Sequence, residues 1–153
     1  MFRDLRKEKR ALTKDECENI LNNANTGVLA LHGDDDYPYA VPLNFIYEDN
    51  KIYFHCAKEG HKIDSIKKDS KASFCVISKD TVVPEKLTTK YESIIAFGRV
   101  HIIKDDEEKL NSIKKLSFKY APYKNSDTEI QKAWNSLIML RFDIEHLSGK
   151  KAK

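Results

Sequence analysis

YAVPLNFIYEDNKIYFHC, residues 39–56, is the stretch that decides the fold class. Residues 39–47 and 51–56 have the two-residue period of half-buried β-strands. The turn-forming sequence 48–50 separates them, so residues 39–56 are predicted to form a β-hairpin. Pro42 lies within the first strand. Because proline donates no ladder hydrogen bond, we expect this strand at a sheet edge or a bulge.

Four further strands are predicted at 28–31, 71–78, 91–104 and 138–147, the last ended by Ser148-Gly149. Gly98 in the fifth strand of the chain indicates a bend or the close approach of another group. The polar stretch 79–90 is long for a hairpin loop, so we expect a connection there that could form part of a pocket rim.

Apolar residues at helical spacing predict helices over 13–25, 60–69, 105–120 and 126–134. Capping boxes at Thr13–Glu16 and Ser126–Glu129 mark two of their starts. Six strands with helices at the front, middle and back favour an α+β fold, a mostly antiparallel six-stranded β-barrel with flanking helices. The chain has no GxGxxG or Walker sequence, which excludes a Rossmann or P-loop interpretation.

The composition is that of one globular domain: 153 residues, 41% hydrophobic and 33% charged. No apolar run approaches the roughly 20 residues of a membrane helix, and no apolar segment follows the charged start, so we expect no membrane span and no secretory signal. Cys17, Cys56 and Cys75 are odd in number and form no CxxC pair. They indicate reduced thiols in a cytoplasm and argue against a disulfide framework or a zinc site.

The net charge of +3 is small, and charges of both signs interleave along the chain. The excess of basic residues lies at 3–10, at 58–71 and at Lys150, Lys151 and Lys153. Residues 1–11 have no apolar period and are expected to form a basic arm, either solvated or packed on a partner subunit. Nucleic-acid binding, which would rest on this arm alone, would require salt-sensitive affinity.

The densest group of polar residues is 55–62, HCAKEGHK, at the predicted passage from a strand into a helix. Gly60 lets the backbone approach a ligand, and the unpaired N–H groups of a helix start favour an anion. His61 and Lys62 add side-chain donors, so a phosphate could bind here. The alternative interpretation is a solvated turn.

His55 and Tyr53 are expected on one face of their strand, with Ile52, Phe54 and Cys56 on the other. A histidine here could donate a proton or anchor a substrate, since its pKa lies near neutrality. The alternative is a hydrogen-bonded histidine at the barrel rim. The remaining histidines have no mutual spacing that indicates a metal site. The acidic cluster 34–36 has the composition of a turn, and the alternative is that such a cluster holds a cation.

The order of several short motifs resembles one family. They are RKEKR at 6–10, PYAVPL at 38–43, IYFH at 52–55, GHK at 60–62, YESIIAFG at 91–98 and LSGK at 147–150. Together they resemble the pyridoxamine 5′-phosphate oxidase-like flavin-binding split barrels, and within them the nitroimidazole-resistance (Nim-type) flavoproteins. The resemblance covers nearly the whole chain, residues 1–153, as one split-barrel domain.

This resemblance implies a cytoplasmic homodimer with two FMN molecules at the subunit interface. It places the FMN phosphate at His61 and Lys62, with His61 where many split barrels have an arginine, and the ring edge against the backbone from Val41 to Asn44. His55 matches a histidine that faces the flavin and is proposed to assist substrate reduction. The full set of cofactor contacts implied is Val41, Pro42, Leu43, Asn44, His55, Cys56, Gly60, His61, Lys62, Ser93 and Lys150, with no metal ligands.

Two functions follow from this resemblance. The first is an FMN-dependent oxidoreductase that reduces a small electron-poor molecule such as a nitroaromatic compound. The second is a non-enzymatic flavin- or haem-binding module, which the shortage of catalytic groups beyond His55 favours. Trp134 is interpreted as a core or interface residue rather than a flavin-stacking one. Lys150 could reach a phosphate or be a solvated tail residue.

Overall fold

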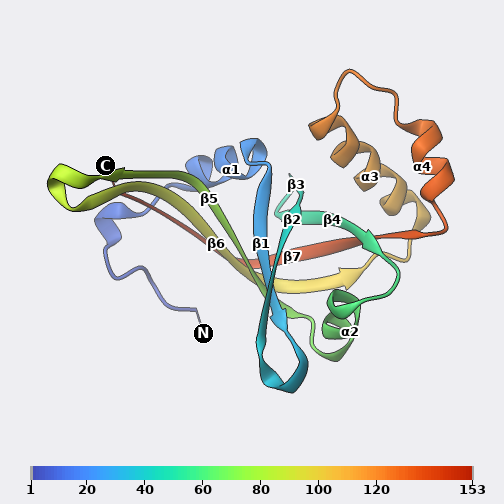
Figure 1. Cartoon of the computed structure of the whole chain (residues 1–153), viewed down its shortest axis with the longest axis horizontal. Coiled ribbons are helices and arrows are strands. Elements are labelled where there is room, and N and C mark those ends of the chain that lie inside the picture. Colours follow the sequence, from blue (N-terminus) through green and yellow to red (C-terminus); the bar gives the residue numbers. More distant parts are fainter. Residues whose placement is uncertain (1, 153) are drawn as a thin grey trace.

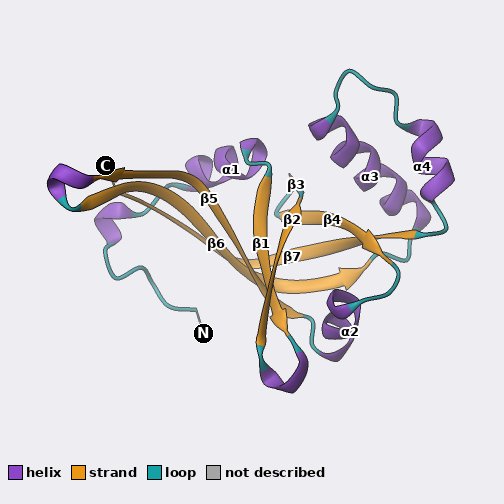
Figure 2. Cartoon of the chain, in the orientation of Figure 1, coloured by secondary structure: helices purple, strands orange, loops and turns teal. Residues whose placement is uncertain are grey.

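The computed structural model describes residues 2–152. Their α-helices are α1 (Lys14–Asn23), α2 (His61–Lys68), α3 (Asp106–Tyr120) and α4 (Asp127–Ala133), with short 3₁₀ turns η1 (Glu8–Arg10), η2 (Asp34–Asp36) and η3 (Pro84–Lys86). The strands are β1 (Thr26–His32), β2 (Pro38–Asn44), β3 (Ile46–Glu48), β4 (Lys51–Ala57), β5 (Lys71–Val83), β6 (Thr88–Ile102) and β7 (Leu137–Ala152) (Figures 1 and 2). Lys153, one of the basic tail residues, lies outside the described part.

All seven strands belong to one antiparallel sheet in the order β2-β1-β5-β6-β7-β4-β3. The two ends of this order, β2 and β3, are consecutive in sequence and are joined only by Phe45. The barrel is therefore closed by the covalent chain and not by a hydrogen-bonded ladder. This is the α+β split barrel that the sequence predicts.

The expectation of six strands is wrong in one respect, because the predicted strand 39–47 divides at Phe45 into β2 and β3. The backbone N–H of Phe45 donates to the hydroxyl of Tyr120 (3.0 Å), and its carbonyl accepts from the Lys119 ammonium (2.9 Å). With both of its backbone polar groups bound to α3, Phe45 leaves the ladder. The chain pairs with β1 before this residue and with β4 after it.

Strands β5, β6 and β7 extend beyond the predicted bounds 71–78, 91–104 and 138–147. The stretch predicted as a polar connection, 79–90, is instead a hairpin, because β5 and β6 stay paired as far as Val83 and Thr88. In Figure 1 this hairpin is an arm that extends from the body of the molecule. Strand β7 also continues through Ser148 and Gly149, which remain paired with β6. The polar residues after position 78 and the Ser-Gly pair at 148–149 predicted that these strands end there. In the structure the backbone stays paired with the neighbouring strand beyond these positions.

The predictions for Pro42 and Gly98 are confirmed. Pro42 is on β2, an edge strand that pairs only with β1. Gly98 lies at a register shift between β6 and β7, and a β-carbon there would be 2.0 Å from the carbonyl oxygen of Asp143. Only glycine allows the two backbones to come this close.

The buried residues form two groups on opposite faces of the sheet. The barrel interior holds Ile52, Phe54 and Cys56 of β4 together with residues of α1 and α2. The second group lies between α3, α4 and the sheet and includes Tyr53 and Met139. This confirms the predicted alternation along β4.

The two predicted capping boxes have different outcomes. Thr13 and Glu16 exchange both hydrogen bonds, at 3.1 and 3.2 Å, so the first is confirmed. The second is wrong: Ser126 makes no side-chain cap, and its backbone (φ −97°, ψ 6°) is not extended as a cap residue requires. Trp134, as predicted, packs half-buried on the second core group, under the Lys109 ammonium.

Lys119 gives the fold a testable pH dependence. Burial lowers the pKa of its ammonium to about 8, below the usual value of about 10.4 for lysine. The folded protein thus binds this proton less tightly than the unfolded chain, so stability rises with pH between about 8 and 10.4. We expect the unfolding free energy of the wild type, relative to Lys119→Met, to rise by about 1–2 kcal/mol over this window, after allowance for solvent screening.

Denaturant unfolding at a series of pH values measures this difference, and titration of the tyrosines cancels between the two proteins. Lys114→Met, an exposed position on the same helix, is the control and should show no such trend. A difference that stays flat or falls with pH would contradict the assignment.

Candidate functional site

The N-terminus of α2 has the geometry of an anion site. Gly60 precedes the helix with φ 137° and ψ 179°, a conformation that L-residues rarely adopt. As a glycine it has no side chain to cap the helix, and no side-chain cap is present. The first-turn N–H groups are therefore open to a negatively charged ligand.

His61 joins this helix start to strand β2. Its ring stacks on Tyr39 with centroids 3.9 Å apart, and its Nε2 lies 3.9 Å from Oδ2 of Asp34 in the β1–β2 turn. The contact with Tyr39 is one that sequence reasoning missed. Strand alternation placed Tyr39 on a face, but no local signal indicated that α2 would pack against it.

Lys62 follows His61 in the first turn of α2 and is half-buried. Burial raises the pKa of the Cys56 thiol on β4, and the positive charge of Lys62 lowers it in part. The start of α2 therefore has one side chain on β2, and the charge of the next acts on a residue of β4.

Strands β2 and β4 each have one edge that is wholly or partly without a strand partner. Strand β2 has β1 as its only partner, and β4 pairs with β3 only over Lys51–Tyr53. The backbone edges of Val41–Asn44 and of 54–57 thus have no strand partner among residues 2–152 on that side. A planar ligand with hydrogen-bonding edges could bind such a backbone.

A sequence profile with the description "Pyridoxamine 5'-phosphate oxidase" matches residues 13–151, nearly the whole chain. The chain belongs to the pyridoxamine 5′-phosphate oxidase family. No protein of curated function matches it.

Solved structures of this fold confirm the architecture. A candidate 5-nitroimidazole antibiotic resistance protein from Bacteroides thetaiotaomicron is 23% identical, with 92% of this chain and 86% of that chain covered and a TM-score of 0.82. A FAD-binding protein from Mesorhizobium loti is also 23% identical, with 94% and 98% covered and a TM-score of 0.72. The FAD and heme binding protein from Mycobacterium smegmatis is 18% identical, with 95% and 74% covered and a TM-score of 0.78.

In this family member, His55 and Cys56 cannot both face one pocket. Cys56 points into the barrel interior, whereas His55 is exposed on the opposite face of β4, opposite Met139 in β7. A ligand that touches both residues has to lie along the unpaired edge of β4, not on either face.

Ser93 and Lys150 do not join the other predicted site residues within one chain. They are direct partners on β6 and β7. Lys71, which closely follows α2, pairs with Arg99, and Ser93 lies six residues earlier on β6, about 20 Å away at the rise of a strand. The two groups of predicted residues therefore lie apart, because the end of β7 is beside the β5–β6 arm and α2 is away from it (Figure 1).

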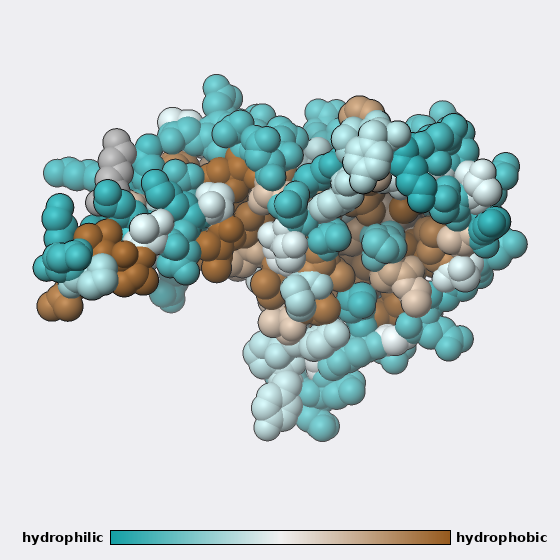
Figure 3. Space-filling model, turned by 45° about the horizontal axis from the view of Figure 1, so that its top comes forward, coloured by the Kyte–Doolittle hydropathy of each residue, from teal (hydrophilic) through white to brown (hydrophobic). Residues whose placement is uncertain are grey.

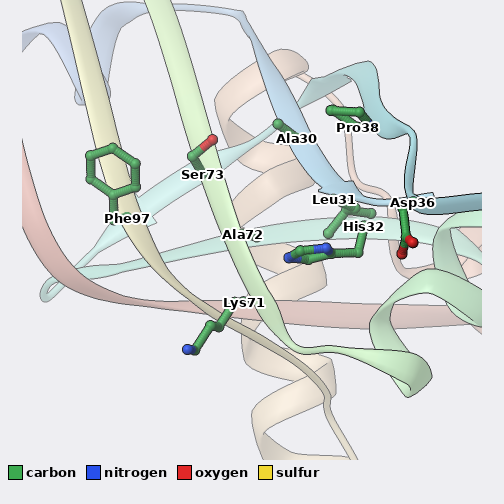
Figure 4. Close-up of a pocket in the computed structure, with 9 residues that line it drawn as sticks. All are labelled: Ala30, Leu31, His32, Asp36, Pro38, Lys71, Ala72, Ser73 and Phe97. Atoms are coloured by element: carbon green, nitrogen blue, oxygen red, sulfur yellow. The ribbon is translucent and has the colours of Figure 1, made fainter.

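A separate hollow of about 320 Å³ lies on the outer face of the sheet, beside the β1–β2 turn (Figure 4). None of the predicted site residues lines it. Its lining is Ala30, Leu31, His32, Asp36, Pro38, Lys71, Ala72, Ser73 and Phe97. Among residues 2–152 no three His, Cys, Asp or Glu side chains gather as a metal ion requires. Nor does any described helix combine the length and apolarity needed to cross a bilayer.

The position of Lys62 predicts the reactivity of Cys56. Removing the positive charge with Lys62→Gln should raise the pKa of the Cys56 thiol further, and because the thiolate is the nucleophile, alkylation should move to higher pH. Mass spectrometry after alkylation at a series of pH values measures each cysteine separately. Cys75, whose pKa is raised by burial alone, is the internal control. An unchanged Cys56 profile would mean that Lys62 points elsewhere.

Proposed function

We propose that this protein is an FMN-binding flavoprotein, and the observation that carries the proposal is the position of α2. Its uncapped N-terminus follows β4 in the chain and contacts β2 through His61 and Tyr39, and the charge of Lys62 acts on Cys56 of β4. A phosphate at the helix start and a planar ring along the edges match the two parts of FMN. Membership of the pyridoxamine 5′-phosphate oxidase family and similarity to FAD-binding proteins support a flavin as the ligand.

FMN is proposed because the helix start provides one phosphate seat. The amides of His61 and Lys62 and the Lys62 ammonium would hold the phosphate, and Gly60 leaves space for it. Backbone groups from Val41 to Asn44 would orient the ring, and Cys56 and His55 would flank its edge on β4. His61 would exchange its contact with Asp34 for the phosphate.

We propose a homodimer that completes this site. The outer face of β1, β5 and β6 exposes Val28, Ile77, Ile95 and Phe97, of which Ile77 is 66% exposed. At the tip of the β5–β6 arm, Val82 and Leu87 are 65% and 95% exposed. Figure 3 shows hydrophobic surface over this arm. A second copy would cover this apolar area, and it could bring Ser93 and Lys150 of one subunit to α2 of the other.

The proposed reaction is the reduction of a small electron-poor compound, of which nitroaromatics are one class. The flavin supplies the electron transfer when it is bound. The chain orients it through the strand edges, holds its phosphate at α2, and offers His55 as the proton donor. His55 is exposed, so a substrate can reach it.

The visible absorbance spectrum of the protein after incubation with FMN tests this proposal. We expect flavin absorbance to stay with the protein, and Lys62→Gln to weaken FMN binding about ten-fold, because it removes a charge-assisted hydrogen bond. Lys67→Gln, exposed in the last turn of the same helix, should bind as the wild type does. A protein that takes up no FMN would overturn the proposal, and a Soret band would favour a haem-binding module.

His55→Ala tests the proton donor separately from cofactor binding. Turnover of a nitroaromatic substrate should fall at least ten-fold or so, as expected for loss of a general acid, while FMN absorbance on the protein stays unchanged. Stopped-flow reduction of the bound flavin by NAD(P)H distinguishes the two half-reactions. If turnover is unchanged, His55 has no part in the reaction.

A further inference from the structure

The N-terminal arm contains a basic hollow beside the end of β7. Residues 6–10, RKEKR, line this hollow of about 440 Å³ with four cations and one carboxylate. Arg6, Lys7 and Lys9 are exposed. No ion pair among residues 2–152 involves any residue of this segment. The basic hollow therefore presents a net positive charge that its own chain does not neutralise.

Contacts at both of its ends hold the arm against the sheet. Phe2 stacks on Phe97 and on His146, with ring centroids 5.3 and 5.0 Å apart. At the other end, Ala11 forms a β-bridge with Lys150. Phe97 belongs to the outer face of β1, β5 and β6, which is the face proposed to meet a second copy. The basic hollow is thus fixed in place at one side of that face.

The opposite charge lies on the turn between β1 and β2. Its residues Asp34–Asp36 are all exposed, and the turn projects from the body of the molecule (Figure 1). Within the described chain their one ion-pair contact is Oδ2 of Asp34 with Nε2 of His61, at 3.9 Å. These carboxylates do not gather as a metal ion requires, in the part of the chain that the structure describes. They suit cations that are spread over a surface.

Within one copy, the basic hollow and the acidic turn are too far apart to meet. Phe97, Ser73 and Ala30 are paired across β6, β5 and β1. Ser93, at the end with the hollow, lies four residues from Phe97 on β6, and Asp34 lies four residues from Ala30 in the opposite direction. At the rise of a strand the separation is roughly 25 Å.

The proposed homodimer removes this separation. It would bring Ser93 and Lys150 of one copy to the start of α2 of the other. The basic hollow is beside Lys150, and Asp34 is beside His61 at that helix start. The same arrangement places the basic hollow of each copy opposite the acidic turn of its partner.

We infer that the basic hollow of each copy binds the acidic turn of the other. This pairing rests on the proposed homodimer, and it adds to it the charges that decide which surfaces meet. Complementary charges across an interface set its register, and arginine–carboxylate pairs add geometric specificity. The partner's cations also draw Asp34 away from His61, which leaves the imidazole free for the flavin phosphate.

Charge reversal in two separate variants tests the pairing. The arm variant reverses the three exposed cations of the hollow: Arg6→Glu, Lys7→Glu and Lys9→Glu. The turn variant makes the turn basic: Asp34→Lys, Asp35→Asn and Asp36→Asn. Asparagine is chosen at the last two positions because φ is 54° and 63° there, and asparagine tolerates this left-handed region.

Sedimentation equilibrium of the full chain measures the dimer dissociation constant. We expect each variant alone to dimerise about ten-fold more weakly than the wild type or worse, because like charges then face each other. An equimolar mixture of the two variants should dimerise about as well as the wild type, since both contacts of a mixed dimer join opposite charges. Misfolding of either variant cannot produce this rescue.

A control variant carries the same change in net charge away from the proposed interface. It reverses three exposed cations in and beside α3 and α4 that form no ion pair among residues 2–152: Lys104→Glu, Lys114→Glu and Lys132→Glu. This protein should dimerise as the wild type does.

The possible failures are distinguishable. A dimeric wild type whose arm and turn variants dimerise equally well would overturn the inference and leave the proposed homodimer standing. A monomeric wild type would overturn both, while the FMN spectrum reports on flavin binding separately. An arm variant that keeps the dimer but loses a salt-sensitive affinity for a duplex oligonucleotide would assign the hollow to nucleic acid and overturn the inference.

Discussion

The architecture depends on how the chain passes Phe45. At this residue the strand leaves its partner β1 and joins β4, and α3 binds the backbone groups that the sheet gives up. The ammonium of Lys119 donates to the carbonyls of Ala24 (2.6 Å) and Phe45, and the hydroxyl of Tyr120 accepts from the Phe45 N–H and donates to the carbonyl of Asn25. Unpaired buried backbone groups would be costly, so without these contacts the ladder could not be interrupted here.

The interruption creates the strand edges on which the proposed function rests. A ladder that stayed closed would pair β2 with β4 along their length and leave no free backbone. The start of α2 follows the unpaired end of β4 in the chain, and His61 contacts β2 through Tyr39. The same feature that makes the barrel split therefore leaves unpaired strand edges in the part of the chain that precedes an uncapped helix start.

Much of this could be predicted from the sequence. The hairpin 39–56 was predictable because β-period and turn signals are local, and the position of Pro42 identified an edge strand. The break at Phe45 was not, because it depends on Lys119 and Tyr120, about 75 residues further along the chain. The length of the β5–β6 arm was missed because most of the residues 79–90 are polar and stay paired through backbone hydrogen bonds, which side-chain patterns do not report.

In the candidate site, too, local features were predictable and long-range contacts were not. Gly60, His61 and Lys62 form one local turn and were found together. The contact of His61 with Tyr39 is tertiary and left no local signal. Sequence order also grouped Ser93 and Lys150 with these residues, yet the register of β6 and β7 places them at the far end, beside Arg10 and Tyr91. One chain therefore has two separate clusters, and a dimer with the apolar outer face buried would be the means of joining them.

A crystal structure of the protein grown with FMN tests whether the flavin binds at the start of α2 and between two copies of the chain. We expect the phosphate on the amides of His61 and Lys62, the ring along the edges of β2 and β4, and residues of a second copy against the same flavin. A flavin bound elsewhere on the chain, or held entirely by one copy with the outer face of β1, β5 and β6 exposed to solvent, would contradict it.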